Sequence, residues 1–286
     1  MIKKTVQTIS LILITLALTV TGYVHRDDMH LGWAKRLDGK TAVVAIFASD
    51  NTCNWNESDL PLKEEMLGYL DTACKYLEEE CKGYGAKTKL IHATGLEDDL
   101  LYMEADINGD ITGADPYTPA IDSFLNSDDV LDKKSDIFGK YGCNSVVYIF
   151  FVNTPEDNPY SSLSYMWMKP GDPEDEFTIL YSYVNHIKEG PVSIAHEITH
   201  AFGAPDLYTS VEVGYDLGIT DEYVKHLYDI GSDDLMFSVY DVKTGKMTYD
   251  TVNKHFSELD AYYTGLIDRC DDVDSYGLGR SIYTNP

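Results

Sequence analysis

Two histidines and two acids lie at the spacing of a metal-binding helix and the turn that follows it. His196 and His200 are four residues apart, so on a helix they lie one turn apart on the same face and can bind one ion. Glu197 stands between them, where its carboxylate can take a proton from a metal-activated water molecule. Gly203 can adopt the left-handed conformation that ends a helix, and the reversed chain would bring Asp206 back to the histidines. Three protein ligands and one open position are typical of catalytic zinc, so the sequence predicts zinc held by the two histidines and Asp206, with Glu197 as general base.

The third ligand has alternatives. An Asp that follows a proline can also cap a turn, and Glu212 or Glu222 would then complete the site. Glu222 is the candidate for a thermolysin-like arrangement, in which the third ligand comes from a later helix. That arrangement gives no role to Gly203 or Met236, so the sequence favours Asp206.

A second segment completes a resemblance to a known family. Residues 233–238 (DDLMFS) resemble the Met-containing turn below the zinc of metzincin peptidases, whose pattern is HExxHxxGxx followed by His or Asp. More narrowly, residues 203–208 (GAPDLY) and 256–265 (FSELDAYYTG) resemble secreted bacterial peptidases of the immune inhibitor A type. The resemblance covers about residues 190–268. It implies a zinc endopeptidase in which Met236 is a packing residue, but this chain has a serine two residues later, where some metzincins carry a tyrosine.

The amino terminus predicts export. Two lysines precede an apolar run over residues 11–20, which is typical of a secretory signal. Residues 1–24 are therefore predicted to be a signal peptide or, if uncleaved, an N-terminal anchor just long enough to span a bilayer. A short linker, residues 25–40, would lead to a single metallopeptidase catalytic domain at residues 41–286.

The net charge of the chain excludes some classes of binding partner. The 286 residues carry a formal net charge of -26, which argues against nucleic acid and anionic membrane surfaces as partners. We expect a secreted monomer that binds a protein or peptide substrate and touches a membrane only if the N-terminal segment stays uncleaved. The alternative from another class is a catalytically silent surface-binding protein of the same fold. Retention of Glu197 argues against it, because a binding protein needs no general base.

Cysteine spacing excludes one disulfide. Cys74 and Cys81 fall on one predicted helix, about 10.5 Å apart along its axis, which is too far for a disulfide. Pairing of the five cysteines is otherwise open, and at least one is unpaired within a monomer.

The order of apolar segments predicts an α/β (α+β) fold. Residues 41–47 and 145–152 are continuous apolar runs, typical of strands buried on both faces. Residues 164–168 are expected to form an exposed edge strand that pairs with extended peptide. We predict a metzincin-like twisted mixed sheet with packed helices, with the zinc helix and the Met-containing turn below the cleft. The other expected strands are residues 88–93 and 177–183, and the other expected helices are residues 61–82, 118–141 (broken near Ser127), 220–230 and 256–267.

An acidic segment offers a second metal site. Asp106, Asn108 and Asp110 stand at alternate positions, as oxygen ligands do in calcium loops. An EF-hand would need a glycine where Ile111 stands and an acid where Tyr117 stands. A solvated acidic loop is therefore the alternative to calcium.

Overall fold

The computed structural model describes most of the chain after the predicted linker. The predicted signal segment lies outside the described residues. Within the part that is described, no helix is long and apolar enough to cross a membrane. The described residues are 36–113, 116, 118–143, 145–165, 176–210 and 218–283.

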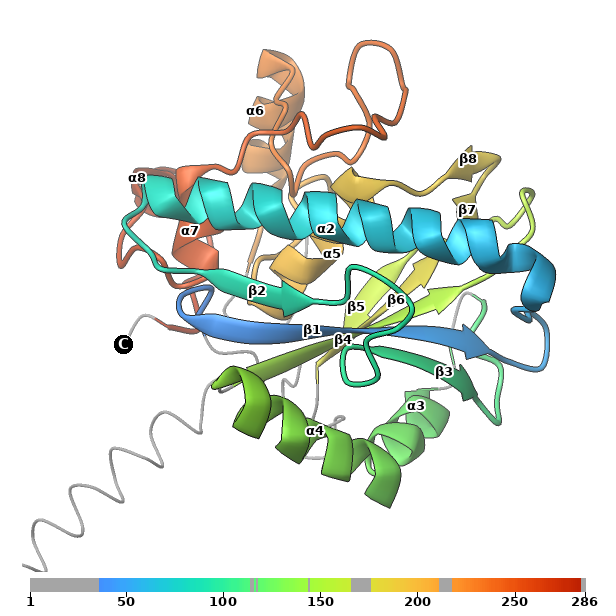
Figure 1. The fold of residues 1–286 in the computed structure, drawn as a ribbon. Helices are drawn as coiled ribbons and strands as arrows, with labels where there is room; N and C mark the ends of the chain where they lie inside the picture. The colour runs from blue at the N-terminus through green and yellow to red at the C-terminus, as the bar shows by residue number, and fades with distance from the viewer. Residues whose placement is uncertain are drawn as a thin grey trace, which may run out of the picture.

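A six-stranded sheet forms the centre of the molecule (Figure 1). Its strands are β1 (Lys40–Ser49), β2 (Lys89–His92), β3 (Tyr102–Asp106), β4 (Ser145–Val152), β5 (Leu163–Tyr165) and β6 (Phe177–Tyr181). The order is β2-β1-β4-β6-β5, and β3 also pairs with β1, after β2 has ended. All pairs are parallel except that of β5 with β6. The predicted α/β class with a largely parallel mixed sheet is confirmed.

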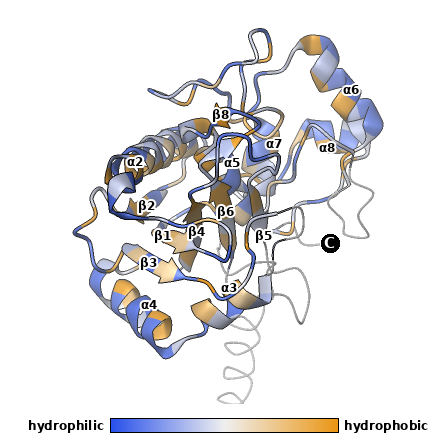
Figure 2. Cartoon of the chain, turned by 90° about the vertical axis from the view of Figure 1, so that its right-hand side faces the viewer, coloured by the Kyte–Doolittle hydropathy of each residue, from blue (hydrophilic) through white to orange (hydrophobic). Residues whose placement is uncertain are grey.

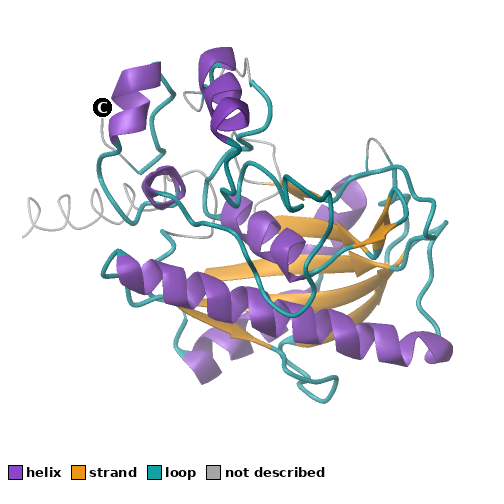
Figure 3. Cartoon of the chain, turned by 90° about the horizontal axis from the view of Figure 1, so that it is seen from above, coloured by secondary structure: helices purple, strands orange, loops and turns teal. Residues whose placement is uncertain are grey.

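Helices cover both faces of this sheet. Helices α2 (Leu60–Gly83) and α5 (Pro191–Ala201) pack on one face, and α3 (Thr118–Leu125) and α4 (Asp128–Tyr141) lie on the other (Figures 1 and 3). Every residue of β4 and of β6 is consequently buried, and the central strands form the hydrophobic middle of the molecule (Figure 2). Ser127 is the extended N-cap of α4, so the predicted helix break is present.

The described part of the chain that follows α5 in sequence contains short helices and no strand of the central sheet. It contains α6 (Asp221–Ile230), α7 (Glu258–Tyr263) and α8 (Asp271–Tyr276) (Figure 1). Helix α7 is shorter than the predicted helix over 256–267, because Ser257 and Asp260 form a capping box at its start and Gly265 adopts a φ of 77° just after its end. Helix α8 was not predicted.

Several short elements differ from the sequence-based expectation. Strand β3 occupies the start of the predicted acidic loop, because pairing with β1 overrides the weak strand propensity of its acids. The strand predicted over 177–183 ends at Tyr181, and a hairpin of β7 (Tyr183–Val184) and β8 (Ile187–Lys188) follows it. Of the predicted strand 164–168, residues 164 and 165 belong to β5, and 166–168 lie outside the described residues. A 3-10 turn, η1 (Glu57–Asp59), precedes α2.

The five cysteines are all free and buried. Cys74 and Cys81 on α2 do not pair with each other, as their spacing predicts.

Candidate metal centre

Helix α5 carries the histidine motif into the interior. Gly190 is its extended N-cap, and Pro191 occupies the first turn, where its missing N–H costs nothing. The helix packs against α2 and against β5 and β6. Its buried position holds His196 and His200 with their rings at 86°, their centroids 4.5 Å apart and their Nε2 atoms 3.0 Å apart.

The chain reverses directly after α5, as predicted. Gly203 has a φ of 100°, a conformation that side chains rarely adopt. A Cβ there would lie 3.1 Å from the Tyr263 carbonyl oxygen and 3.2 Å from the Ile282 Cδ1, so the packing also favours glycine. The Gly203 N–H donates to the His200 carbonyl at 2.8 Å, which closes the end of the helix.

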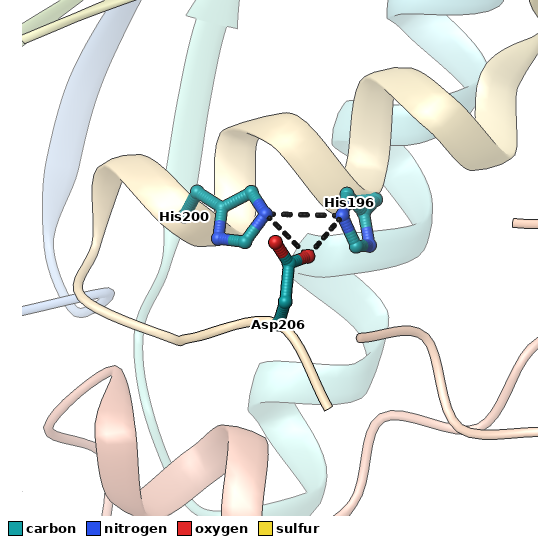
Figure 4. A group of neighbouring side chains, drawn as sticks. All are labelled: His196, His200 and Asp206. Carbon is teal, nitrogen blue, oxygen red and sulfur yellow. Dashed lines mark hydrogen bonds and ion pairs between the residues drawn. The ribbon is translucent and has the colours of Figure 1, made fainter. Parts of the chain in front are cut away.

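This reversal brings Asp206 to the histidine pair (Figure 4). Its Oδ1 lies 3.2 Å from the His196 Nε2 and 3.1 Å from the His200 Nε2. Among the described residues, these three form the one group of three or more His, Cys, Asp or Glu side chains close enough to share a metal ion. Glu222 is exposed on α6 and does not join them, while Glu212 lies outside the described residues.

The hydrogen bonds of the two rings orient them for metal binding. The His196 Nδ1 lies 3.0 Å from the Leu235 carbonyl oxygen, and the His200 Nδ1 lies 2.7 Å from that of Ala204. A carbonyl only accepts, so each Nδ1 carries a proton, and the Nε2 of a neutral ring offers a lone pair.

The converging atoms fit a zinc ion. The two imidazole Nε2 atoms and the Asp206 Oδ1 converge on one point, and with neutral rings all three atoms would be electron-pair donors. Such donors repel unless a proton or a cation lies between them. Ligands about 2.0–2.1 Å from a tetrahedral metal are about 3.3–3.4 Å apart, close to the separations found here, and two nitrogens with one carboxylate oxygen are a common zinc set.

Electrostatics show that a cation is favoured at this point. Burial opposes a charge on His200, but the charge of Asp206 and its hydrogen bond raise the pKa of His200 to about 9. Burial also works against ionisation of Asp206, yet the charge of His200 and the hydrogen bonds of both rings hold the pKa of Asp206 well below its usual range. A metal ion would therefore displace a proton from this group when it binds.

The backbone of the Met-containing turn accepts hydrogen bonds from the His196 ring and from the segment that carries Asp206. The Leu235 carbonyl accepts from His196, and the next carbonyl, that of Met236, accepts from the Leu207 N–H at 2.9 Å. The turn is itself held by Asp234, whose Oδ1 accepts from the Met236 N–H at 2.7 Å. Met236 is fully buried, as expected of a packing residue.

Glu197 faces a cavity beside the histidines. A cavity of about 490 Å³ is lined by His196 and Glu197 and by residues of the Met-containing turn and the loop after it, including Ser238 and Tyr240. Ser164 of β5 donates to the Glu197 Oε2 at 2.7 Å. The candidate general base therefore lies next to a candidate ligand, in an open space large enough for a substrate side chain.

The structure adds residues that the sequence analysis did not single out. Tyr208 lines the same cavity and is 46% exposed. Burial, the charge of Asp206 and a hydrogen bond to that carboxylate raise the pKa of Tyr208, so its hydroxyl is neutral and can donate. One signal for it was present: in an extended chain, residues two apart point the same way, and Tyr208 is two residues after Asp206. Ser164 and Glu189, by contrast, reach the site from segments with no periodic pattern.

The acidic segment proposed for calcium is held by hydrogen bonds. Asp106, Asn108 and Asp110 are exposed. The loop after them is anchored by Asp50, whose Oδ2 accepts from the backbone of Ile111 and from the backbone and hydroxyl of Thr112 at 2.9–3.0 Å. Calcium binding by the three predicted ligands stays a prediction.

Comparison with known proteins adds no relative. The sequence matches no protein-family model and no curated protein.

Proposed function

We propose that this protein is an exported zinc-dependent endopeptidase of the metzincin type. The observation that carries the proposal is the position of Glu197. Its carboxylate lines the cavity that His196 also lines, and His196, His200 and Asp206 form a ligand set with room for substrate beside it. A group that only bound a structural metal would need no acid at this place and no open cavity.

The roles of the chain's own residues follow from this arrangement. His196, His200 and Asp206 would hold zinc, whose Lewis acidity would activate a water molecule and polarise the scissile carbonyl. Glu197 would take the proton of the attacking water and return it to the leaving nitrogen as the C–N bond breaks. Ser164 would keep the Glu197 carboxylate turned towards the reacting atoms.

Tyr208 supplies the donor that the resemblance leaves open. Ser238 stands two residues after Met236 and donates to the Tyr240 carbonyl at 3.0 Å, so it is engaged in its own loop. The Tyr208 hydroxyl lies beside Asp206 in the cavity. We assign it the hydrogen bond to the carbonyl oxygen as that oxygen gains negative charge.

Strand β5 would position the substrate backbone. It ends the order of the sheet, and its other side pairs with no strand of the described chain. It also packs against α5, beside the metal ligands. An extended peptide could pair with this free edge and lie across the site.

We also propose that the protein is exported, that it is a monomer and that it has a separate calcium site. Export rests on the apolar run near the amino terminus, with a retained anchor as the alternative. The excess of acidic residues suits a soluble exported protein that binds neither nucleic acid nor anionic membranes. Calcium at Asp106, Asn108 and Asp110 is a separate site that catalysis does not require.

The decisive experiment separates a peptidase from a silent binding protein. Zinc-loaded protein should hydrolyse casein, and a zinc chelator should abolish that turnover. Glu197→Gln should bind zinc with unchanged stoichiometry and fold, but lose at least about a hundredfold in rate. Near wild-type turnover by this variant at equal zinc content would remove the general-base role. Absence of any hydrolysis by zinc-loaded wild type would favour the binding protein.

A further inference from the structure

The cavity beside the metal centre contains a buried carboxyl that the proposed reaction does not use. Glu189 directly precedes Gly190, the N-cap of α5, and is only 4% exposed. Its side chain lines the same cavity as His196 and Glu197. Its N–H donates to the Ser182 carbonyl at 3.0 Å, so the segment between β8 and α5 is fixed at this point.

The nearby lysines are engaged elsewhere. Lys188 does not line the cavity, and its Nζ lies 2.8 Å from both carboxylate oxygens of Glu65. Lys254 donates to the Tyr240 carbonyl at 2.6 Å. Within the described chain, no lysine, arginine or histidine forms an ion pair with Glu189.

Glu189 therefore forms no ion pair within the described chain, in a place where a charge is costly. Burial raises the pKa of Glu189 to about 7; the Ser193 hydroxyl and His196 oppose the rise, and the charge of Glu197 adds to it. A buried carboxylate is stable only when it is paired, so a ligand that brought a cation to this point would gain a strong interaction.

The cavity walls suit the stem of a long basic side chain. Tyr208, Tyr228, Phe237 and Tyr240 line the cavity. Lysine and arginine lay their apolar stems along such surfaces, and aromatic rings attract their cationic ends. Asp241 also lines the cavity, but its Oδ1 already accepts from the N–H and the hydroxyl of Thr244 at 2.7 Å. Asp241 is also partly exposed, so Glu189 is the buried lining carboxyl that the proposed reaction does not use.

We propose that Glu189 is a specificity-determining residue that binds the cationic group of a lysine or arginine side chain beside the scissile bond. The position follows from the cavity, whose walls include both Glu197 and the metal ligand His196. Trypsin-like serine peptidases select basic residues in a comparable way, with an acid in a side-chain pocket. The inference rests on the proposed peptidase function for its meaning, but pocket selectivity can be measured without turnover.

The first measurement compares matched substrates. Peptides that differ only in lysine or norleucine, or in arginine or citrulline, beside the bond are offered to the zinc-loaded full chain. The basic member should be favoured in kcat/KM by at least about tenfold, and Glu189→Gln should reduce the ratio to within about threefold. Glu222→Gln, which removes the same charge from the exposed face of α6, should keep the preference. If Glu189→Gln does not fold, Glu189→Asp retains the charge and should still prefer the basic peptide.

The second measurement uses binding alone. Glu197→Gln holds peptide without turning it over, so titration calorimetry on its zinc-loaded form should give the same preference for the lysine peptide, and adding Glu189→Gln should remove it. If wild type cleaves nothing while this binding preference is present, the proposed peptidase function is wrong, but Glu189 still forms a pocket for a basic side chain. Equal affinity for both peptides, no binding of the lysine peptide, or an unchanged preference in Glu189→Gln would overturn the inference.

Discussion

The hydroxyl of Ser164 on strand β5 donates a hydrogen bond of 2.7 Å to the Oε2 of Glu197 on helix α5. Thr178 on β6 lies 2.7 Å from the same hydroxyl and, because it can donate to it, leaves the Ser164 proton for Glu197. The candidate general base is thus linked to the edge strand on which we expect the peptide to pair. If an extended peptide pairs with β5, this contact would relate the position of the proposed base to that of the substrate.

Removing this contact should slow the reaction without loss of metal. Ser164→Ala should lower kcat about three- to tenfold, because Glu197 loses the donor that fixes one of its oxygens. Zinc content should stay unchanged. Ser164→Thr keeps the hydroxyl and should restore most of the rate. Equal rates for Ser164→Ala and wild type would show that Glu197 is positioned by other contacts.

Tyr208 should act on the reaction and not on metal binding. Tyr208→Phe removes only the hydroxyl, so we expect kcat/KM to fall about ten- to a hundredfold while zinc affinity and fold are retained. Transition-state inhibitors should lose more affinity than substrate does. Tyr228→Phe, which removes a hydroxyl from another residue of the same cavity, is the matched control and should have little effect on rate. A larger loss of zinc than of rate in Tyr208→Phe would make Tyr208 a support for Asp206 instead.

Local patterns explain which parts of the site could be predicted from the sequence. On a helix, residues four apart such as His196 and His200 lie side by side, and the chain reversal at Gly203 returns Asp206 to them. The ligand set can therefore be predicted without knowledge of contacts between distant parts of the chain. Strand β4 is equally evident, because a strand covered on both faces must be apolar throughout.

Residues that reach the site through distant contacts could not be predicted. Ser164 meets Glu197 only because β5 pairs with β6 and α5 packs beside it. Glu189 is a single acid between a two-residue strand and a helix, and its burial depends on the whole fold. Strand β3 was not predicted for a related reason: it is a strand because it pairs with β1, and its own composition does not favour a strand.

Two buried acids, Asp234 of the Met-containing turn and Asp260 of α7, should make stability depend on pH. Burial and the charge of Asp234 hold the pKa of Asp260 well above its usual range. The folded protein then binds a proton that the unfolded chain releases above about pH 4, so stability falls as pH rises towards the folded pKa. Asp260→Asn keeps an oxygen that can accept from Ser257, as the Asp260 Oδ2 does at 3.0 Å, and removes the titration.

The expected difference is measurable by denaturant unfolding. Between about pH 5 and about pH 8, the unfolding free energy of wild type should fall relative to that of Asp260→Asn. Glu258→Gln, an exposed change on the same helix, should follow wild type at both pH values. Parallel pH dependence of wild type and Asp260→Asn would mean that Asp260 is ionised in the folded protein.

Met236 should contribute packing and not coordination. A thioether is a poor zinc ligand beside imidazole and carboxylate, and the Met236 backbone, not its sulfur, holds Leu207. Met236→Leu is nearly isosteric, so it should cost less than about 1.5 kcal/mol of stability and leave zinc bound. Zinc loss from a folded Met236→Leu protein would show that the sulfur coordinates.

Asp206 is the residue on which the metal assignment depends most. Its Oδ1 lies 3.1–3.2 Å from both Nε2 atoms and accepts no other hydrogen bond within the described chain, while Glu222 is exposed on α6. Asp206→Ala removes one of three ligands, so it should release zinc far more readily than Glu222→Ala, by at least about a hundredfold in dissociation constant. Asp206→Asn keeps the shape but loses the negative charge, and it should bind zinc with intermediate affinity. Competition with a chromophoric chelator measures all three variants on one scale, and circular dichroism checks that each is folded. Tight zinc binding by Asp206→Ala together with zinc loss in Glu222→Ala would transfer the third position to α6 and replace the metzincin arrangement with the thermolysin-like one.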